Sequence, residues 1–315
     1  MDYITLGRTG LKVSKVGLGC GGFSRLGQSY GASEESSINV VRSAIDIGIN
    51  YIDTATSYKT EPIVGKALES TNREEVVVSS KFGIKPLLEG EAKAEEWVPQ
   101  CVEASLERLQ MDYIDVYHVH GVKESDVDVV HEKVIPQLLK AKEQGKIRFL
   151  AYSEAFGSDT SHEMFKAYAD KDDFDVAMVG FNLINPSARR TVFLNLLEKK
   201  VGTEIMFAIR NALYQPDLFR KIIDELESEG KIDSAIFEGK DPVIYFFGND
   251  DSDTMAEIAY RYAAYEPGAD ILLSGTGKVE HLKKNVNWIL NGPLEESVKS
   301  RFDAVLEEIE SVSGN

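Results

Sequence analysis

Four polar residues that could carry out proton-transfer chemistry stand at or just after the ends of short strand-like runs. Asp53 closes the run 50–53, Lys81 closes 76–81 and His120 closes 113–120, while Tyr58 lies in the loop after Asp53. The three run ends are 28 and 39 residues apart, each about the length of one strand-plus-helix unit. Consecutive parallel strands would therefore bring an acid, an ammonium and an imidazole to one carboxyl edge, where parallel barrels place their chemistry.

The chemistry available to this set is acid catalysis by a phenol. An unperturbed tyrosine has a pKa of roughly 10, and a nearby ammonium such as Lys81 lowers it toward the working range. Asp53 would hold Lys81 charged while it is partly buried. His120 would donate a hydrogen bond to a substrate carbonyl. Each residue alone is better explained as an ordinary surface or core residue, but the four in order favour a functional site.

His118 lies two residues before His120 on the same face of its predicted strand. It would point into the barrel beneath the site, so we expect it to be a buried histidine with a polar partner. Ser79, on the same face as Lys81 one strand away, is the candidate partner.

The motifs around these residues resemble the catalytic tetrad of the aldo-keto reductases. They are Asn-Tyr-Ile-Asp-Thr-Ala at 50–55 with Tyr58, Val-Ser-Ser-Lys at 78–81 and Asp-Val-Tyr-His-Val-His at 115–120. A glycine-rich run at 16–22 and Ser-Gly-Thr-Gly-Lys at 274–278 fit the same family, and the likeness covers nearly the whole chain. The resemblance implies reduction of an aldehyde or ketone with Tyr58 as general acid.

A late segment carries the features of an anion site, because glycines, a hydroxyl and a helix N-terminus occur together with Lys278 and His281. The resemblance implies that it binds the 2′-phosphate of NADP(H), with NAD(H) left open as an alternative. The glycines at 17–22 lack the final glycine and the acidic residue of a Rossmann fingerprint, so that interpretation is rejected. The residues that this resemblance assigns to the cofactor are Gly21, Gly22, Ser153, Glu154, Met178, Ile209, Arg210, Ser274, Gly275, Thr276, Gly277, Lys278, His281 and Asn285.

Several of these positions depart from the family pattern. Glu154 stands where an asparagine usually holds the nicotinamide carboxamide, and Met178 stands where a glutamine often does. Ile209 aligns with an aromatic residue that usually stacks on the nicotinamide, and the next residue, Arg210, is a candidate for the pyrophosphate or for an ion pair with the acidic insertion. At the last helix, a usually acidic position is Lys284.

Strand and helix patterns alternate along the chain, which predicts an α/β fold: a (β/α)8 TIM barrel forming one domain over residues 1–315. An N-terminal hairpin is expected at 3–14, an insertion after the seventh strand at 210–250, and an extra C-terminal helix at about 295–310. The insertion combines a helical pattern at 218–229 with a β-rich run at 243–247. Strands are expected near 16–20, 50–53, 76–81, 113–120, 147–153, 174–181, 204–209 and 270–274. Helices are expected near 34–48, starting after Ser33, and near 59–69, 93–109, 129–144, 160–170, 187–200, 253–265 and 279–290.

Composition limits the partners. The chain has 315 residues and a formal charge of −17, which argues against nucleic acid and anionic membranes. No leader or membrane span is visible, so we expect a cytoplasmic protein, monomeric or weakly homo-oligomeric. Cys20 and Cys101 are expected to be separate reduced thiols.

Two other function classes stay open. One is a nucleotide-binding regulatory or sensor protein on the same barrel with little turnover, favoured by the altered carboxamide positions. The other is an isomerase or aldolase using Lys81 as a Schiff-base nucleophile. The substrate is a small carbonyl compound whose walls are expected from loops at 23–32, 84–92, 121–127 and 210–250. The aromatic residues available to it are Tyr30, Trp97, Phe246 and Phe247.

Overall fold

Eight parallel strands close into a barrel in the computed structural model, which describes residues 1–315. The predicted barrel is confirmed, and each strand pairs with the next in the chain until β10 closes on β3. The barrel strands are β3 (Val16–Gly19), β4 (Tyr51–Asp53), β5 (Val77–Phe82), β6 (Ile114–Val122), β7 (Ile147–Glu154), β8 (Val176–Gly180), β9 (Gly202–Met206) and β10 (Ile271–Ser274).

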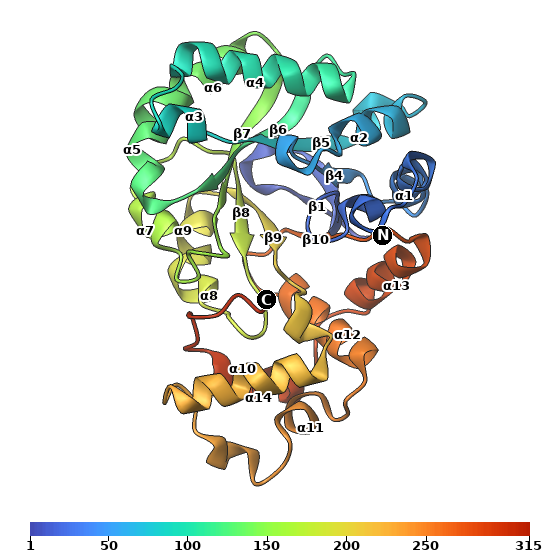
Figure 1. Ribbon diagram of the computed structural model, residues 1–315, viewed down its shortest axis with the longest axis vertical. Helices are drawn as coiled ribbons and strands as arrows, with labels where there is room; N and C mark the ends of the chain where they lie inside the picture. The colour runs from blue at the N-terminus through green and yellow to red at the C-terminus, as the bar shows by residue number, and fades with distance from the viewer.

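Helices surround this barrel and cover the outer faces of the strands (Figure 1). Ser33 caps the first of them as expected, because its side chain accepts a hydrogen bond from the Ser36 backbone N–H. The short helix α3 was not expected from the sequence. The surrounding helices are α1 (Glu34–Asp46), α2 (Glu61–Leu68), α3 (Lys85–Leu88), α4 (Ala94–Leu109), α5 (Val127–Val129), α6 (Ile135–Glu143), α7 (Glu163–Ala167), α8 (Ala188–Thr191), α9 (Phe193–Glu198), α12 (Ser252–Ala264) and α13 (Val279–Leu290).

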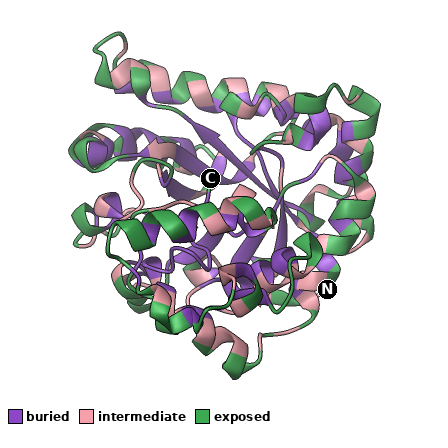
Figure 2. Ribbon diagram, turned by 60° about the horizontal axis from the view of Figure 1, so that its bottom comes forward, coloured by how far each residue is buried: buried purple, intermediate pink, exposed green.

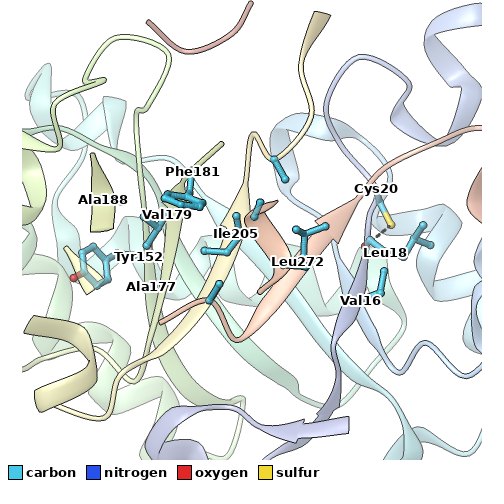
Figure 3. Close-up of a cluster of buried hydrophobic side chains, with 14 of the residues drawn as sticks. Val16, Leu18, Cys20, Tyr152, Ala177, Val179, Phe181, Ala188, Ile205 and Leu272 are labelled. Carbon is cyan, nitrogen blue, oxygen red and sulfur yellow. Dashed lines mark hydrogen bonds between the residues drawn. The ribbon is translucent and has the colours of Figure 1, made fainter. Parts of the chain in front are cut away.

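Strand alternation divides the core into two clusters. Outward-facing residues such as Leu18, Val179 and Leu272 pack against the helices in a large cluster, part of which Figure 3 shows. Inward-facing residues such as Val77 and Val116 form a small separate cluster inside the barrel. The strands are accordingly buried on both faces while the helices expose their outer faces (Figure 2), as expected for parallel sheets.

An N-terminal hairpin closes the amino end of the barrel. Strands β1 (Tyr3–Thr5) and β2 (Lys12–Ser14) pair antiparallel, as predicted. Leu6, Leu11 and Val13 of this hairpin belong to the inner cluster, so apolar side chains fill the bottom of the barrel. The opposite, carboxyl end is left for the polar residues.

The insertion after β9 forms a helical lobe that lies below the barrel in Figure 1. Helix α10 (Pro216–Ser228) confirms the predicted helix, and the C-terminal helix α14 (Glu296–Leu306) belongs to the same lobe, where its Phe302 stacks on Phe246. The β-rich interpretation of 243–247 was wrong: this segment is helix α11 (Pro242–Phe247). Asp241 caps α11 by accepting hydrogen bonds from the backbone N–H groups of residues 243 and 244, and a proline at the first position suits a helix start.

The last residues return from this lobe to the carboxyl end of the barrel. The side-chain amide of Asn185 donates to the Val312 carbonyl oxygen over 2.9 Å, and that of Asn182 donates to the Ser313 carbonyl oxygen over 3.1 Å. The backbone N–H of Ala212 donates to the Gly314 carbonyl oxygen over 3.2 Å. We call residues 312–315 the C-terminal tail; it borders the loop that follows β9.

The chain contains no helix with the length and apolar composition that crossing a membrane would require. Cys20 and Cys101 are both free thiols, as expected.

Candidate active site

The ends of β4 and β5 bring Asp53 and Lys81 into direct contact. The Lys81 ammonium donates to the Asp53 carboxylate over 2.5 Å and to the Thr54 carbonyl oxygen over 2.8 Å, and its side chain is fully buried. Burial alone would lower the pKa of Lys81, but Asp53, with Tyr58 and Glu204, raises it above its ordinary value. Lys81 is therefore a fixed cation, and a Schiff-base role, which needs a free amine, does not fit this geometry.

Tyr58 lies directly above this ion pair, with the Lys81 ammonium 5.0 Å from the centre of its ring. Lys81 acts on the phenol in the expected direction, because it favours the phenolate. Burial has the larger effect, however, and raises the pKa of Tyr58 above its usual value. Tyr58 therefore carries its proton at neutral pH, as a proton donor must.

His120 stands beside Tyr58, with the two rings 5.5 Å apart and perpendicular. Its Nδ1 atom lies 3.4 Å from the Ser57 hydroxyl, and the other ring nitrogen makes no hydrogen bond within the protein. Burial, and the positive charge of Lys81, lower the pKa of His120 to about 3. The imidazole is therefore neutral at physiological pH, so it can donate a hydrogen bond but holds no ionisable proton to give away.

A cavity of about 980 Å³ opens from Tyr58 across the carboxyl end of the barrel to α13. Asp53 and Tyr58 are part of its wall, Gly21 lies directly against the Tyr58 ring, and Met178 and Met206 also line the cavity. Of the residues assigned to a cofactor, those that line the cavity are Gly21, Gly22, Met178, Ile209, Arg210, Gly275, Thr276, Gly277, Lys278, His281 and Asn285.

The far end of the cavity has the features of an anion site. Helix α13 begins at Val279, and its first backbone N–H groups lie beside Lys278, which together with His281 has no ion-pair partner. Loops meet closely here: a Cβ atom at Gly277 would lie 2.4 Å from Gly27 Cα, so glycine is required. A phosphate group fits these N–H groups and cations.

Arg210 is the other cation in the cavity wall. Its guanidinium stacks on Phe207, 3.5 Å from the ring centre, and faces Phe23 at 5.1 Å. The Nε atom is buried without a hydrogen-bond partner, and burial lowers the pKa of Arg210 to about 10, so it stays charged. The suggested ion pair with the acidic insertion is absent, which leaves Arg210 free to meet an anionic ligand.

Ser153 and Glu154 were expected at the nicotinamide end, but neither lines the cavity. The Ser153 hydroxyl accepts from the Gly121 N–H over 2.9 Å. Glu154 is buried behind the wall, where it pairs with His162 at 2.8 Å and accepts from the Gly180 N–H over 2.6 Å. A direct contact of Glu154 with the nicotinamide therefore does not fit the structure. Ser274 is likewise turned away and lies 3.1 Å from the Tyr260 hydroxyl.

Strand β9 ends earlier than expected, and this changes which residues meet a ligand. The prediction ran to Ile209, but the strand stops at Met206 because Phe207 adopts a left-handed backbone conformation with φ of 64°. Met206 at the end of the strand and Phe207 directly after it, which sequence reasoning missed, both line the cavity, as Ile209 does.

Only one of the four aromatic candidates for the substrate wall lies in the cavity. Tyr30 lines it and is largely exposed. Trp97 instead donates to the Gly83 carbonyl oxygen outside the cavity. Phe246 and Phe247 are buried in the helical lobe against Phe302, so they form its core and not a substrate wall.

Comparison with known proteins identifies the family. The model of the Aldo/keto reductase family matches residues 15–307, so this chain belongs to that family of NAD(P)H-dependent oxidoreductases. L-galactose dehydrogenase of Arabidopsis thaliana is 27% identical over 99% of this chain and 97% of its own length. Aldo-keto reductase YhdN of Bacillus subtilis is also 27% identical, over 98% and 96%.

Solved structures show the same fold. The holo form of aldo-keto reductase AKR11C1 from Bacillus halodurans superposes with a TM-score of 0.73 at 20% identity, covering 100% of both chains. An aldo/keto reductase from Klebsiella pneumoniae, solved in complex with NADP and acetate, gives a TM-score of 0.68 at 20% identity over 96% of this chain and 94% of its own.

Proposed function

We propose that this protein reduces an aldehyde or ketone to the alcohol with NADP(H), and that Tyr58 is the general acid. The observation that carries this proposal is the stack of Asp53, Lys81 and Tyr58 at one end of a cavity whose other end is a phosphate-type site. NADPH, when bound, supplies the hydride.

The residues of the site divide the remaining work. Tyr58 holds the proton that the carbonyl oxygen receives, and Lys81 stabilises the phenolate that remains. His120 orients the carbonyl through a neutral N–H, because its lowered pKa rules it out as the proton source at neutral pH. Asp53 keeps Lys81 charged and in place.

The cavity fits the cofactor better at its phosphate end than at its nicotinamide end. Lys278, His281 and the start of α13 would hold the 2′-phosphate, and Arg210 would hold the pyrophosphate, since its buried Nε lacks a partner. The cavity wall also contains the thioethers of Met178 from β8 and Met206 from the end of β9, which can pack against the nicotinamide but form only weak hydrogen bonds with it.

The similarity to a sugar dehydrogenase supports a sugar-derived carbonyl compound as the substrate. The test is a panel of aldehydes, ketosugars and larger ketones with NADPH and with NADH, read at the nicotinamide absorbance, with Tyr58→Phe as the reference for background. Turnover of any panel member that Tyr58→Phe abolishes supports the proposal. Equal rates with both proteins would refute it.

The two methionines in the cavity wall support a second candidate function, that of a nucleotide-binding sensor with little turnover. Met178 and Met206 would orient the nicotinamide only weakly, and this favours a protein that binds the nucleotide without fast turnover. Micromolar NADPH binding together with no turnover across the panel would select this function.

A further inference from the structure

A second buried carboxylate lies inside the barrel beneath the site. Glu204 comes from the middle of β9, two residues before Met206, and its side chain is completely buried. A carboxylate in such a place must be paired or lose its charge. The reduction chemistry described above makes no use of it.

Glu204 is connected to the tetrad through His118 and Ser79. Its Oε1 atom lies 3.1 Å from His118 Nε2 and accepts the Tyr51 hydroxyl over 2.5 Å. On the other side of the ring, His118 Nδ1 lies 3.3 Å from the Ser79 hydroxyl, which donates to Asp53 over 2.9 Å. The expected pairing of Ser79 with His118 is thus present, and it continues to the carboxylate that holds Lys81.

Every polar neighbour of the His118 ring can accept a hydrogen bond. Ser79 gives its single proton to Asp53, so toward Nδ1 its oxygen can only accept. The other neighbour of Nδ1 is the Ser80 carbonyl oxygen at 3.4 Å, which is also an acceptor. Nε2 faces a carboxylate oxygen at ion-pair distance, although not in good hydrogen-bond alignment. Hydrogen on both ring nitrogens, which makes His118 a cation, is the state that would satisfy all of these acceptors.

The barrel interior then contains two cations, Lys81 and His118, and two anions, Asp53 and Glu204, so its net charge is zero. Removing one member would leave a buried charge without its partner, which is strongly unfavourable. The other titratable groups facing these four are all neutral at physiological pH or lie at the cavity wall. They are Cys20 from β3, Tyr51 from β4, Tyr58 above Lys81, His120 from β6, and Arg210 after β9.

We propose that His118 and Glu204 are positioning residues of the reductase site, forming an ion pair that balances the charge beneath Tyr58. With His118 charged, Glu204 does not offset the field of Lys81 at the phenol. Without His118, a second carboxylate in a medium of low dielectric would act against phenolate formation. This inference rests on the proposed function for its effect on catalysis, but the ion pair itself can be tested separately.

The catalytic test is a double-mutant cycle read as the pH profile of kcat/KM. In carbonyl reduction the rate falls at alkaline pH as Tyr58 loses its proton. In His118→Gln, Glu204 keeps the Tyr51 hydroxyl as a partner but loses its cation, so in the alkaline range, where the carboxylate is ionised, this limb should move up by about one pH unit or more. Glu204→Gln should leave the limb in place or move it down, because no second carboxylate then opposes phenolate formation. The double variant should return the limb to the wild-type position.

A matched control comes from the other fully buried histidine–carboxylate pair, His162 with Glu154. His162→Gln disrupts a pair of the same kind outside the barrel interior, so it should lower stability without moving the limb. An unmoved limb in His118→Gln, or a double variant displaced as far as His118→Gln alone, would overturn the proposal. So would a shift of the same size in His162→Gln.

A measurement on the wild-type protein covers the case in which His118→Gln does not fold. The chain has five histidines, so ¹⁵N-histidine spectra at pH 7–8 can resolve each ring. One buried ring with both nitrogens protonated, perturbed by Glu204→Gln, supports the ion pair, and a neutral His118 ring overturns it. This result does not depend on turnover, whereas absence of turnover over the whole carbonyl panel would defeat the proposed function alone.

Discussion

Gly21 and Tyr58 approach each other so closely that no side chain fits between them. A Cβ atom at Gly21 would lie 2.4 Å from Tyr58 Cε2. The sequence suggested that this glycine lets the backbone approach the cofactor; in the structure it also makes room for the phenol ring. The position of the proposed proton donor therefore depends on the loop after β3.

This contact predicts the effect of Gly21→Ala. The ring of Tyr58 must shift, and a displacement of about 1 Å in an active site costs on the order of a hundredfold in rate. Gly83→Ala is the control, because a Cβ atom there meets nothing within 4 Å. Steady-state kinetics on both variants is the measurement, and wild-type kcat/KM in Gly21→Ala would contradict the prediction.

Tyr58→Phe should abolish most carbonyl reduction and leave nucleotide binding almost unchanged, since the ring stays and only the proton source is lost. General acid catalysis contributes about 10²–10⁴-fold. Turnover measured at the nicotinamide absorbance, with NADPH affinity by fluorescence titration, tests this. Near-normal turnover would remove Tyr58 from its proposed role.

Lys81→Met should shift the alkaline limb of the pH profile upward. Lys81 lowers the pKa of Tyr58 against the larger effect of burial, so its loss raises that pKa further, and the weaker acid reacts more slowly at neutral pH. The variant also leaves Asp53 without its cation, which costs about 3–5 kcal/mol of stability. Denaturant unfolding and a pH series of kcat/KM are the measurements, and an unmoved limb would contradict the assignment.

The buried pair of Glu154 and His162 predicts a stability effect in place of a cofactor effect. Glu154→Gln should lower the free energy of unfolding by about 1–3 kcal/mol, because a buried hydrogen-bonded charge is lost. The variant should weaken binding of the oxidised and the reduced cofactor equally, or should affect neither. Calorimetry showing a selective loss of the oxidised form would restore the contact with the nicotinamide.

Lys278→Ala should erode a preference for NADPH over NADH. The lysine stands at the start of α13 without an ion-pair partner, and losing a charged hydrogen bond costs about 1.5–3 kcal/mol, on the order of ten- to a hundredfold in affinity. Lys283→Ala, on the same helix but outside the cavity lining, is the control. Equal affinity for both cofactors in the wild-type protein would refute the prediction.

The positions of site residues could be predicted best where a run of strand-forming residues ends sharply. Asp53, Lys81 and His120 each terminate a run of strand-forming residues, so their common edge could be predicted. At β9 the apolar run continues through Ile209, and nothing in it marks the left-handed Phe207 that ends the strand. Segment 243–247 has strand-forming residues, but Asp241 and Pro242 start a helix there, a capping signal that outweighs propensity.

The pairings of Lys81 with Asp53 and of His118 with Ser79 could be predicted, but other pairings between distant residues could not. Glu154 ends β7, a position suited to a contact with the nicotinamide, but its side chain pairs with His162, which reaches it because the loop before α7 folds back. Glu204 gave no signal at all, because a single acid in an apolar run has no local partner. Its partners, Tyr51 from β4 and His118 from β6, come from strands that are distant from β9 in the sequence.

The C-terminal tail has a consequence for how the rim of the cavity forms and opens. Asn182 and Asn185 bind residues that are 131 and 127 positions away, so each of these hydrogen bonds closes a loop of more than a hundred residues. Contacts of this kind form late in folding and, when few and near the surface, break first. Amide hydrogen exchange should therefore be faster at Ala212, which bonds the tail next to Arg210, than in the barrel strands. The loop after β9 and the C-terminal tail would then open locally at the entrance to the site, while the barrel strands keep their hydrogen bonds.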